Sequence, residues 1–324
     1  MPSRSLIDPE LLPGLDLFPQ VELSAQTLPE VRQLMAANAG ALPGADPSLA
    51  TRVVHQVETA AATIPVRVFT PLGGAEDAVF PALLHLHGGG YVLGAASNHD
   101  ATNAALAAEL GCVIASVEYR LAPETRHPGP VEDAYAALKW LHDQASSLRV
   151  DPARIAVGGE SAGGGLAACL ALLARDRGEV KLVFQHLIYP MLDDRTAAAT
   201  DPHPFAGQFL WTPEKNRFGW EALLGHEPGL PTTSPYAAAA RADDLAGLPP
   251  AFMSVGALDL FIDENLDYAR RLIRGGVPTE LHVFPGAYHG FDLVPAARNA
   301  MVARNRSRAA LRRALHPPLV PPPR

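Results

Sequence analysis

Short, continuous apolar runs alternate with segments of helix length over most of this chain. The runs read PALLHLH, CVIASVEY, RIAVGG, KLVFQHLIYP, AFMSVGALD and ELHVFPG, and they occupy residues 81–87, 112–119, 154–159, 181–190, 251–259 and 280–286. Strands that are apolar on both faces belong to parallel sheets with helices on both sides. The sequence therefore predicts an α/β fold, with a mostly parallel central sheet and helices on both of its faces.

The segments between these runs predict helices at about residues 98–110, 130–146, 162–176, 262–275 and 295–314. Upstream of the first run, residues 52–60 and 64–70 alternate or are β-branched, which predicts an antiparallel pair of strands. One interval, from Pro190 to about Pro249, has no clear strand but contains Phe205, Phe209, Trp211, Phe218 and Trp220. Irregular loops of that length are uncommon, so this interval is expected to be an insertion with helices of its own.

One segment has the pattern of a catalytic serine turn. Residues 159–163, GESAG, match Gly-x-Ser-x-Gly between the run RIAVGG and the next helical segment. A serine on such a sharp turn has a strained backbone, and glycine two positions away on either side avoids collisions with neighbouring backbone. The adjacent helix N-terminus favours developing negative charge. We predict that Ser161 is a nucleophile; the alternative is a glycine-rich turn that only packs the helix on the sheet.

A second glycine-rich segment, HGGG at residues 87–90, follows the run PALLHLH. Successive glycines allow backbone N–H groups to approach a substrate oxygen closely. Together with the N–H of Ala162, those of Gly89 and Gly90 are predicted to form an oxyanion hole. The segment lacks the continuation that a phosphate loop or a dinucleotide site requires.

The paired histidines His85 and His87 would share one face of a strand and could chelate a metal ion. The sequence offers no third ligand at a suitable spacing, so no metal and no cofactor are expected. His87 is expected to hydrogen-bond the glycine loop instead.

The acid and the base are expected downstream of Ser161, because this kind of site has the chain order serine, acid, histidine. Asp259 ends the run AFMSVGALD, and His289 follows the last run in the loop FPGAYHGFD. Both would lie at the carboxyl ends of strands, where open α/β sheets bind ligands. Asp263, at the start of the next helix, remains the alternative acid, although an acidic residue there can also act as a helix cap.

Together, these segments resemble the hormone-sensitive lipase family of bacterial carboxylesterases. The similarity lies in HGGGYVLG (87–94), YRLAPE (119–124), PVEDAYAALKW (130–140), GGESAGGGLAA (158–168), SPYAA (234–238), DLFIDEN (259–265) and YHGF (288–291). The resemblance implies an α/β-hydrolase fold with a helical cap, a triad of Ser161, His289 and Asp259, and oxyanion donors at Gly89, Gly90 and Ala162. Two positions differ from the usual family pattern, Glu160 in place of aspartate and Leu260 in place of proline.

The expected organisation combines a core with a cap. Cap helices are expected over residues 1–50, the first part of the core over 51–190, a cap insertion over 191–232, and the second part of the core over 233–324. Residues 29–39 have helical spacing that places Val31, Leu34 and Met35 on one face, which we expect to pack on the aromatic insertion. Tyr91, Phe209 and Trp211 are expected to bind the substrate.

The expected chemistry is hydrolysis of short- to medium-chain acyl esters through an acyl-enzyme intermediate, with a small-molecule ester as substrate. The rival hypotheses are a lipase for long-chain insoluble esters, an amidase or deacetylase, and a receptor that binds without catalysis. Some receptors of this kind lack the histidine, which is present here as His289.

Composition bears on partners and location. The net charge is −8, and the basic residues concentrate only between Arg304 and Arg313, so no nucleic-acid partner is expected. No apolar run reaches the roughly 18 residues of a membrane span. The first residues lack the features of a signal peptide, so we expect a cytoplasmic protein. Cys112 and Cys169 are expected to be buried and unpaired. The family resemblance leaves a homodimer open.

Overall fold

In the described part of this computed structural model, residues 2–17, 21–39, 44–73 and 78–317, the strands form one eight-stranded sheet in the order β1-β2-β4-β3-β5-β6-β7-β8. The strands are β1 (Ala50–Glu58), β2 (Thr63–Pro71), β3 (Phe80–Leu86), β4 (Val113–Val117), β5 (Val150–Glu160), β6 (Phe184–Ile188), β7 (Ala251–Gly256) and β8 (Thr279–Phe284). β2 runs antiparallel to both β1 and β4, and the other neighbouring pairs are parallel. The predicted mostly parallel sheet with an antiparallel pair at its start is confirmed.

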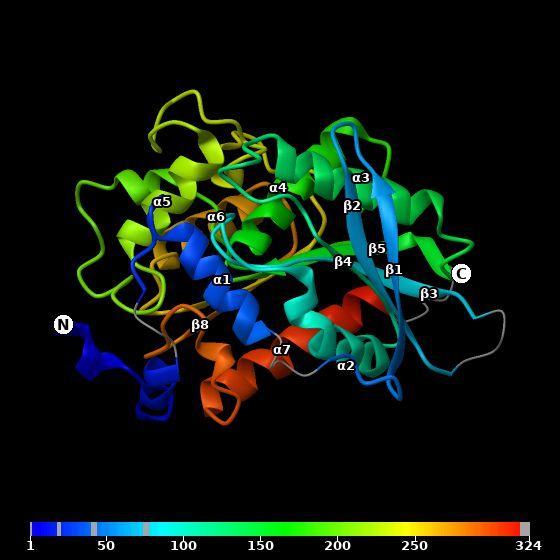
Figure 1. Ribbon diagram of the computed structural model, residues 1–324, viewed down its shortest axis with the longest axis horizontal. Helices are drawn as coiled ribbons and strands as arrows, with labels where there is room; N and C mark the ends of the chain where they lie inside the picture. Colours follow the sequence, from blue (N-terminus) through cyan, green and yellow to red (C-terminus); the bar gives the residue numbers. More distant parts are fainter. Residues whose placement is uncertain (1, 18–20, 40–43, 74–77, 318–324) are drawn as a thin grey trace.

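Helices cover both faces of this sheet (Figure 1). α2 (Asp100–Leu110) and α7 (Arg298–Leu315) lie on one face, and α3 (Gly129–Asp143), α4 (Ala162–Arg177) and α6 (Ile262–Arg274) lie on the other. Successive side chains of a strand point to opposite faces. Leu84 and Leu86 of β3 therefore join the core under α3 and α4, whereas Leu83 joins the core under α2 and α7. Because both faces are buried, the central strands have continuous apolar sequences.

Strand order brings two distant motifs together. β3 pairs with β4 on one side and with β5 on the other, so Leu86 of β3 lies opposite Gly159 of β5. The chain reverses its direction of travel across the sheet at this point, and open α/β sheets bind ligands at such a switch. The loop that follows β3 and the turn that follows β5 consequently emerge side by side.

The helix expected at residues 29–39 is present as α1 (Leu28–Ala39), but its surroundings differ from the prediction. Val31 is buried, whereas Leu34 and Met35 are 45% and 37% exposed. The expectation that all three side chains face a partner surface is therefore wrong. Helical spacing identified a common face but not how much of it the rest of the protein covers.

Polar contacts of Arg32 fasten α1 to the core. The guanidinium donates to the carbonyl oxygens of Val92 at 2.9 Å and Ala122 at 2.7 Å, and it pairs with Glu124 at 2.7 Å. These contacts attach α1 to the segment after the glycine-rich loop and to the YRLAPE segment. None of them involves the aromatic insertion.

The interval between β6 and β7 is helical where it is regular, as expected. All of it is described, and it contains α5 (Pro213–Leu224) and two 3-10 helices, η4 (Asp194–Ala198) and η5 (Ala239–Arg241), with no strand. The boundaries expected between cap and core stay predictions. Residues 1, 18–20, 40–43, 74–77 and 318–324 of the expected units lie outside the described residues.

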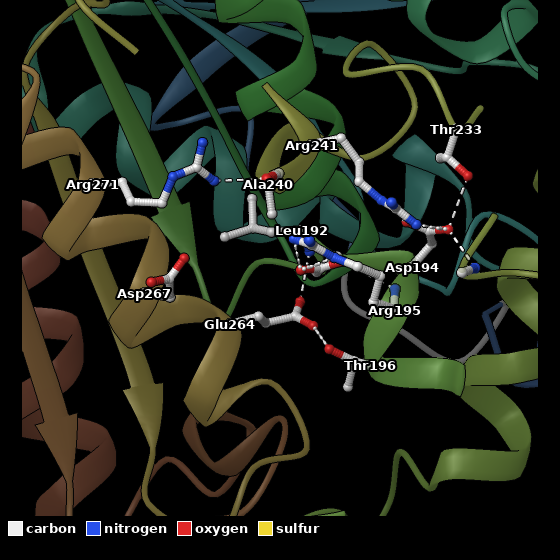
Figure 2. A network of polar contacts seen from close by, with 12 residues as sticks. Leu192, Asp194, Arg195, Thr196, Thr233, Ala240, Arg241, Glu264, Asp267 and Arg271 are labelled. Carbon is white, nitrogen blue, oxygen red and sulfur yellow. Dashed lines mark hydrogen bonds and ion pairs between the residues drawn. The ribbon is translucent and has the colours of Figure 1, made fainter. Parts of the chain in front are cut away.

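A buried polar network fastens both ends of this insertion (Figure 2). Asp194, which is fully buried, accepts hydrogen bonds from the guanidinium of Arg241 at 2.7 and 2.9 Å and from the hydroxyl of Thr233 at 3.0 Å. Glu264 of α6 accepts one from the N–H of Leu192 at 2.7 Å and another from the hydroxyl of Thr196. Asp194 and Arg241 therefore hold the two ends of the insertion together, and Glu264 attaches its start to α6, the helix that follows Asp259.

Glu264 should make stability depend on pH. Burial raises the pKa of Glu264 well above 4.5, although the hydrogen bonds from Thr196 and Leu192 oppose this shift. The folded chain binds this proton more tightly than the unfolded chain, so the stabilisation is complete below the unfolded-state pKa and is lost as the pH rises through the folded-state pKa. We expect Glu264→Gln, which cannot ionise, to gain stability relative to the parent as the pH rises from about 5 to about 8.

Urea unfolding of both proteins across this range measures the difference. Glu30→Gln, at an exposed position of α1, is the matched control and should show no such trend. A difference between Glu264→Gln and the parent that stays constant with pH would contradict the argument.

The remaining sequence expectations concern cysteines and membrane spans. Cys112 and Cys169 are both buried and unpaired, as expected, and burial raises the pKa of each thiol to about 12. Among the described helices, none combines the length and apolar character that crossing a membrane requires.

Candidate active site

Ser161 occupies the sharp turn between β5 and α4. Its backbone angles, φ 57° and ψ −122°, lie in a region that residues other than glycine rarely adopt. A Cβ atom at Gly159 or Gly163 would come within 2.2 or 2.1 Å of the Leu86 carbonyl oxygen, so both positions require glycine. The N–H of Ser161 donates to the Ile188 carbonyl at 2.9 Å and holds the turn against β6. The strained turn that the GESAG pattern predicts is present.

His289 connects Ser161 to Asp259. Its Nε2 lies 2.9 Å from Ser161 Oγ, and its Nδ1 lies 2.9 Å from Asp259 Oδ2. Asp259 is fully buried and also accepts the N–H of Phe261 at 2.9 Å through Oδ1. The alternative acid, Asp263, is exposed on α6. The geometry can pass a proton from a serine hydroxyl to an imidazole that a carboxylate orients.

The loop positions of the acid and the base differ slightly from the sequence expectation. β7 ends at Gly256, so Asp259 lies in the turn after the strand rather than at its last residue. β8 ends at Phe284, and His289 follows in the loop before η6 (Phe291–Leu293). Both residues still lie beyond the carboxyl ends of parallel strands, as expected.

Aromatic rings enclose the imidazole of His289, which is 8% exposed. The ring centroids of Tyr189, Phe261 and Trp211 lie 4.8, 5.2 and 6.4 Å from that of His289. The Tyr189 hydroxyl donates to Asp292 Oδ1 at 2.7 Å, and burial raises the pKa of the Asp292 carboxyl. The sequence analysis missed Tyr189 and Phe261. Two sequence signals could have identified them: Tyr189 directly follows the strand β6, and Phe261 comes two residues after Asp259.

The glycine-rich loop after β3 lies beside Ser161, because a Cβ atom at Gly88 would lie 3.4 Å from Ser161 Cβ. Gly89 and Gly90 have φ of 128° and 61°, and a Cβ atom at Gly90 would lie 2.1 Å from the ring of Trp211. Within the described ranges, no hydrogen bond uses the N–H groups of Gly89, Gly90 or Ala162. These three donors are therefore available to a ligand oxygen.

His87 and Tyr119 support this loop from inside the protein. His87 Nδ1 donates to the Gly88 carbonyl at 2.9 Å, and burial lowers the pKa of His87 to about 3, so the ring is neutral. The ring stacks on Tyr119 with 4.3 Å between centroids, and the Tyr119 hydroxyl donates to the His87 carbonyl at 2.7 Å. The predicted contact between His87 and the glycine loop is confirmed.

Glu160, the residue before Ser161, connects β5 to β3. His85 Nε2 lies 3.1 Å from the Glu160 carboxylate, and its Nδ1 lies 3.0 Å from Ser116 Oγ. Burial by itself would raise the pKa of Glu160, but the nearby histidines, above all His85, which also hydrogen-bonds the carboxylate, and then His99 and His186, outweigh it and hold this pKa at about 2. Glutamate at this position therefore stays ionised and anchored.

Among the residues that the structure describes, His85, Glu160 and His99 form a group that could hold a metal ion. Their potential ligand atoms all lie within 4.8 Å of one another, and imidazole and carboxylate are ligands that zinc accepts. The sequence analysis paired His85 with His87 and found neither of the other two, because η3 (Ala96–His99), β3 and β5 meet only in the folded chain. The hydrogen bonds of His85 and Glu160 satisfy both side chains without a metal.

The three expected substrate-binding side chains lie at different depths. Trp211 lies against Gly90 and beside His289. Phe209 contacts the neighbour of His289 instead, with 6.1 Å between the ring centroids of Phe209 and Tyr288. Tyr91 is buried in the core and only 1% exposed. Of the three, Trp211 is the one that the fold places beside both His289 and the glycine-rich loop.

The fold and this site define a class. A family model described as alpha/beta hydrolase fold matches residues 83–293, a range that includes Ser161, Asp259 and His289 and covers well over half of the chain. The chain belongs to this family of α/β hydrolases.

Similar proteins narrow the class to esterases. Carboxylesterase NlhH from Mycobacterium tuberculosis is 37% identical over 97% of this chain and 98% of its own length. Esterase LipI from the same species is 35% identical over 97% of each chain. The solved structure of a bacterial heroin esterase has a TM-score of 0.90 and 41% identity, and the match covers 96% of this chain and 98% of the other. This protein is a carboxylic ester hydrolase of the hormone-sensitive lipase type, as its motifs implied.

Proposed function

We propose that this protein hydrolyses short- to medium-chain carboxylic esters through a triad of Ser161, His289 and Asp259 and an acyl-enzyme intermediate. The observation that carries the proposal is the continuous pair of 2.9 Å contacts from Ser161 Oγ through the His289 ring to Asp259. Free N–H donors beside Ser161 and names of esterases among the similar proteins support it.

Acylation begins when His289 Nε2 accepts the proton of Ser161 while Oγ bonds to the ester carbonyl carbon. The carbonyl oxygen becomes an oxyanion, to which the N–H groups of Gly89, Gly90 and Ala162 donate. Removing one such donor in a comparable hydrolase costs about 3–4 kcal/mol. His289 then returns the proton to the leaving alkoxide oxygen, and the alcohol departs from an acyl ester of Ser161.

Deacylation repeats these steps with water. His289 accepts a proton from water as its oxygen attacks the acyl carbonyl, and the same N–H groups hold the second oxyanion. The acyl–oxygen bond breaks, Ser161 recovers its proton from His289, and the carboxylic acid leaves. Asp259 keeps its hydrogen bond with His289 Nδ1 throughout, orients the ring and stabilises the imidazolium form. Both half-reactions use only protein groups and water.

Trp211 supports a limit on acyl length. The indole is 8% exposed, lies against Gly90 and donates its N–H to Asn216 Oδ1 at 3.3 Å. A large ring that packing and a hydrogen bond hold beside the oxyanion donors restricts the room for an acyl chain. Phe209, which packs on Tyr288, and Tyr91, which packs on Trp220, would act on the substrate only through these neighbours.

Hydrolysis of soluble 4-nitrophenyl esters tests the proposal. We expect the highest kcat/KM for acyl chains of about two to eight carbons. Trp211→Ala should shift the optimum to longer chains and change the ratio of decanoyl to butanoyl hydrolysis by roughly tenfold or more, because each methylene in an apolar pocket contributes about 1 kcal/mol or more to discrimination. Trp140→Ala, at a partly exposed position of α3, is the matched control and should leave the profile unchanged.

Two outcomes would redirect this assignment. Faster hydrolysis of hexadecanoyl than of butanoyl esters, both in true solution, would overturn the short- to medium-chain preference. Amides cleaved as fast as the matched esters would favour an amidase acting with the same groups.

A further inference from the structure

The N-terminal segment Pro2–Leu17 packs on the loop that carries His289. It consists of two 3-10 helices, η1 (Pro2–Leu6) and η2 (Pro9–Leu17). The N–H of Asp8 donates to the Gly286 carbonyl at 3.0 Å, three residues before His289. The hydroxyl of Tyr288, the residue directly before His289, donates to the Leu11 carbonyl at 2.8 Å across 277 positions of sequence.

Apolar contacts make this attachment continuous. Ile7, Leu11 and Leu15 are buried and share a core cluster with Tyr288, Phe291 and Val294 on either side of His289. The fit is close at Gly14, where a Cβ atom would lie 2.5 Å from the Tyr288 hydroxyl and 2.3 Å from Val294 Cγ2. The segment therefore contacts the loop both before and after the imidazole.

The same segment also caps the helix that ends the loop. The Glu10 carboxylate accepts the backbone N–H of Arg298 at 2.6 Å, and the Asp8 carboxylate accepts a hydrogen bond from the side-chain amide of Asn299 at 3.0 Å. The residue at the N-cap of α7, Ala297, offers no side-chain cap of its own. Acidic groups stabilise a helix N-terminus, so these two carboxylates fix the far end of the loop.

Its other end reaches the insertion that carries Trp211. Ser3 Oγ donates to Gln208 Oε1 at 2.5 Å, and the neighbouring Phe209 ring packs on Tyr288 at 6.1 Å between centroids. One segment thus contacts both the loop that carries His289 and the insertion that carries Trp211.

We propose that Pro2–Leu17 is a brace that positions His289, with Tyr288 as the positioning residue that transmits its hold through the hydrogen bond to Leu11. This role rests on the triad function proposed above. The loop between β8 and α7 must keep the imidazole within hydrogen-bond reach of Ser161 Oγ, and a misplacement of about 1 Å can lower an enzymatic rate by roughly a hundredfold. The brace contacts this loop at Gly286 and Tyr288, before His289, and at Phe291 and Val294, after it.

Tyr288→Phe tests the brace in the full-length chain, because it removes only the hydroxyl. We expect kcat for a soluble butanoyl ester to fall by about tenfold with KM unchanged, because substrate binding does not involve this group while proton transfer depends on the imidazole position. The rate at which a phosphonate labels Ser161 should fall by the same factor. Expressing kcat per phosphonate-titrated site removes any contribution from unfolded protein.

Two further variants sharpen the comparison. Tyr268→Phe removes another fully buried tyrosine hydroxyl, one with no hydrogen-bond partner among the described residues, and it should keep the parental kcat. Gly14→Ala wedges the brace away from Tyr288 and Val294 and should lower kcat as Tyr288→Phe does. Its effect should be smaller in the Tyr288→Phe background, because one of the two collisions is then absent.

His289→Ala separates failure of the brace from failure of the proposed function. If this variant keeps turnover, the assignment of His289 as the base is wrong, and the proposed role of the brace is refuted as well. If His289→Ala is inactive while Tyr288→Phe and Gly14→Ala keep the parental kcat and labelling rate, the triad stands and the brace is refuted.

Discussion

Ser161→Ala is expected to lower kcat for soluble esters by about a million-fold, the size of the effect when the nucleophile of a comparable serine hydrolase is removed. The physical reason is that Ser161 Oγ is the atom that His289 Nε2 contacts at 2.9 Å, and alanine offers no group to form the acyl ester. The fold should remain, because the turn is held by the Ser161 backbone N–H and by glycines at 159 and 163 rather than by the hydroxyl.

Turnover, circular dichroism and mass spectrometry after phosphonate treatment measure this result. The parent should gain one phosphonate on Ser161, and Ser161→Ala should gain none. Ser97→Ala, the same chemical change at an exposed position, should keep parental turnover and labelling. Turnover retained in Ser161→Ala would refute the assignment of Ser161 as the nucleophile.

Asp259→Asn is expected to lower kcat by about ten-thousandfold. Asp259 Oδ2 accepts the proton of His289 Nδ1, which leaves Nε2 free to accept the proton of Ser161. An asparagine amide at this place would donate to Nδ1 and favour the tautomer with its proton on Nε2, which cannot act as the base. The hydrogen bond from the Phe261 N–H to Oδ1 can persist, so the turn should stay intact.

Asp263→Asn is the matched control, because the sequence left Asp263 as the competing acid. Its side chain is exposed on α6, and we expect this variant to retain near-parental kcat. A large loss in Asp263→Asn together with a small loss in Asp259→Asn would reverse the assignment. Steady-state kinetics of both variants with one soluble ester decides between them.

Much of the fold was predictable because its signals are local. A strand buried on both faces needs an unbroken apolar run, and β3, β5 and β7 each lie within or overlap the run that predicts them. The serine turn was equally readable, because a Cβ atom at Gly159 or Gly163 would strike the Leu86 carbonyl. Only glycine fits at these two positions, so the Gly-x-Ser-x-Gly pattern directly indicates the sharp turn.

The amphipathic helix α1 shows where such local signals end. Helical spacing groups Val31, Leu34 and Met35, yet only Val31 is buried. Periodicity reports which side chains share a face, whereas burial depends on how far the neighbouring surface extends. Arg32, a polar residue, supplies hydrogen bonds from this helix to the carbonyl oxygens of Val92 and Ala122.

By itself, the sequence determined the α/β pattern, the strained turn at Ser161 and the glycine-rich loop, because each follows from side-chain size or spacing within a few residues. The order serine, acid, histidine is a property of this kind of fold, and it pointed to Asp259 and His289 as candidates. Only the tertiary structure decided that β3 lies beside β5, that Tyr189 and Phe261 enclose His289, and that Leu11 meets Tyr288. These contacts join residues far apart in the chain. Their geometry is set by the packing of whole strands and loops, and no local spacing encodes it.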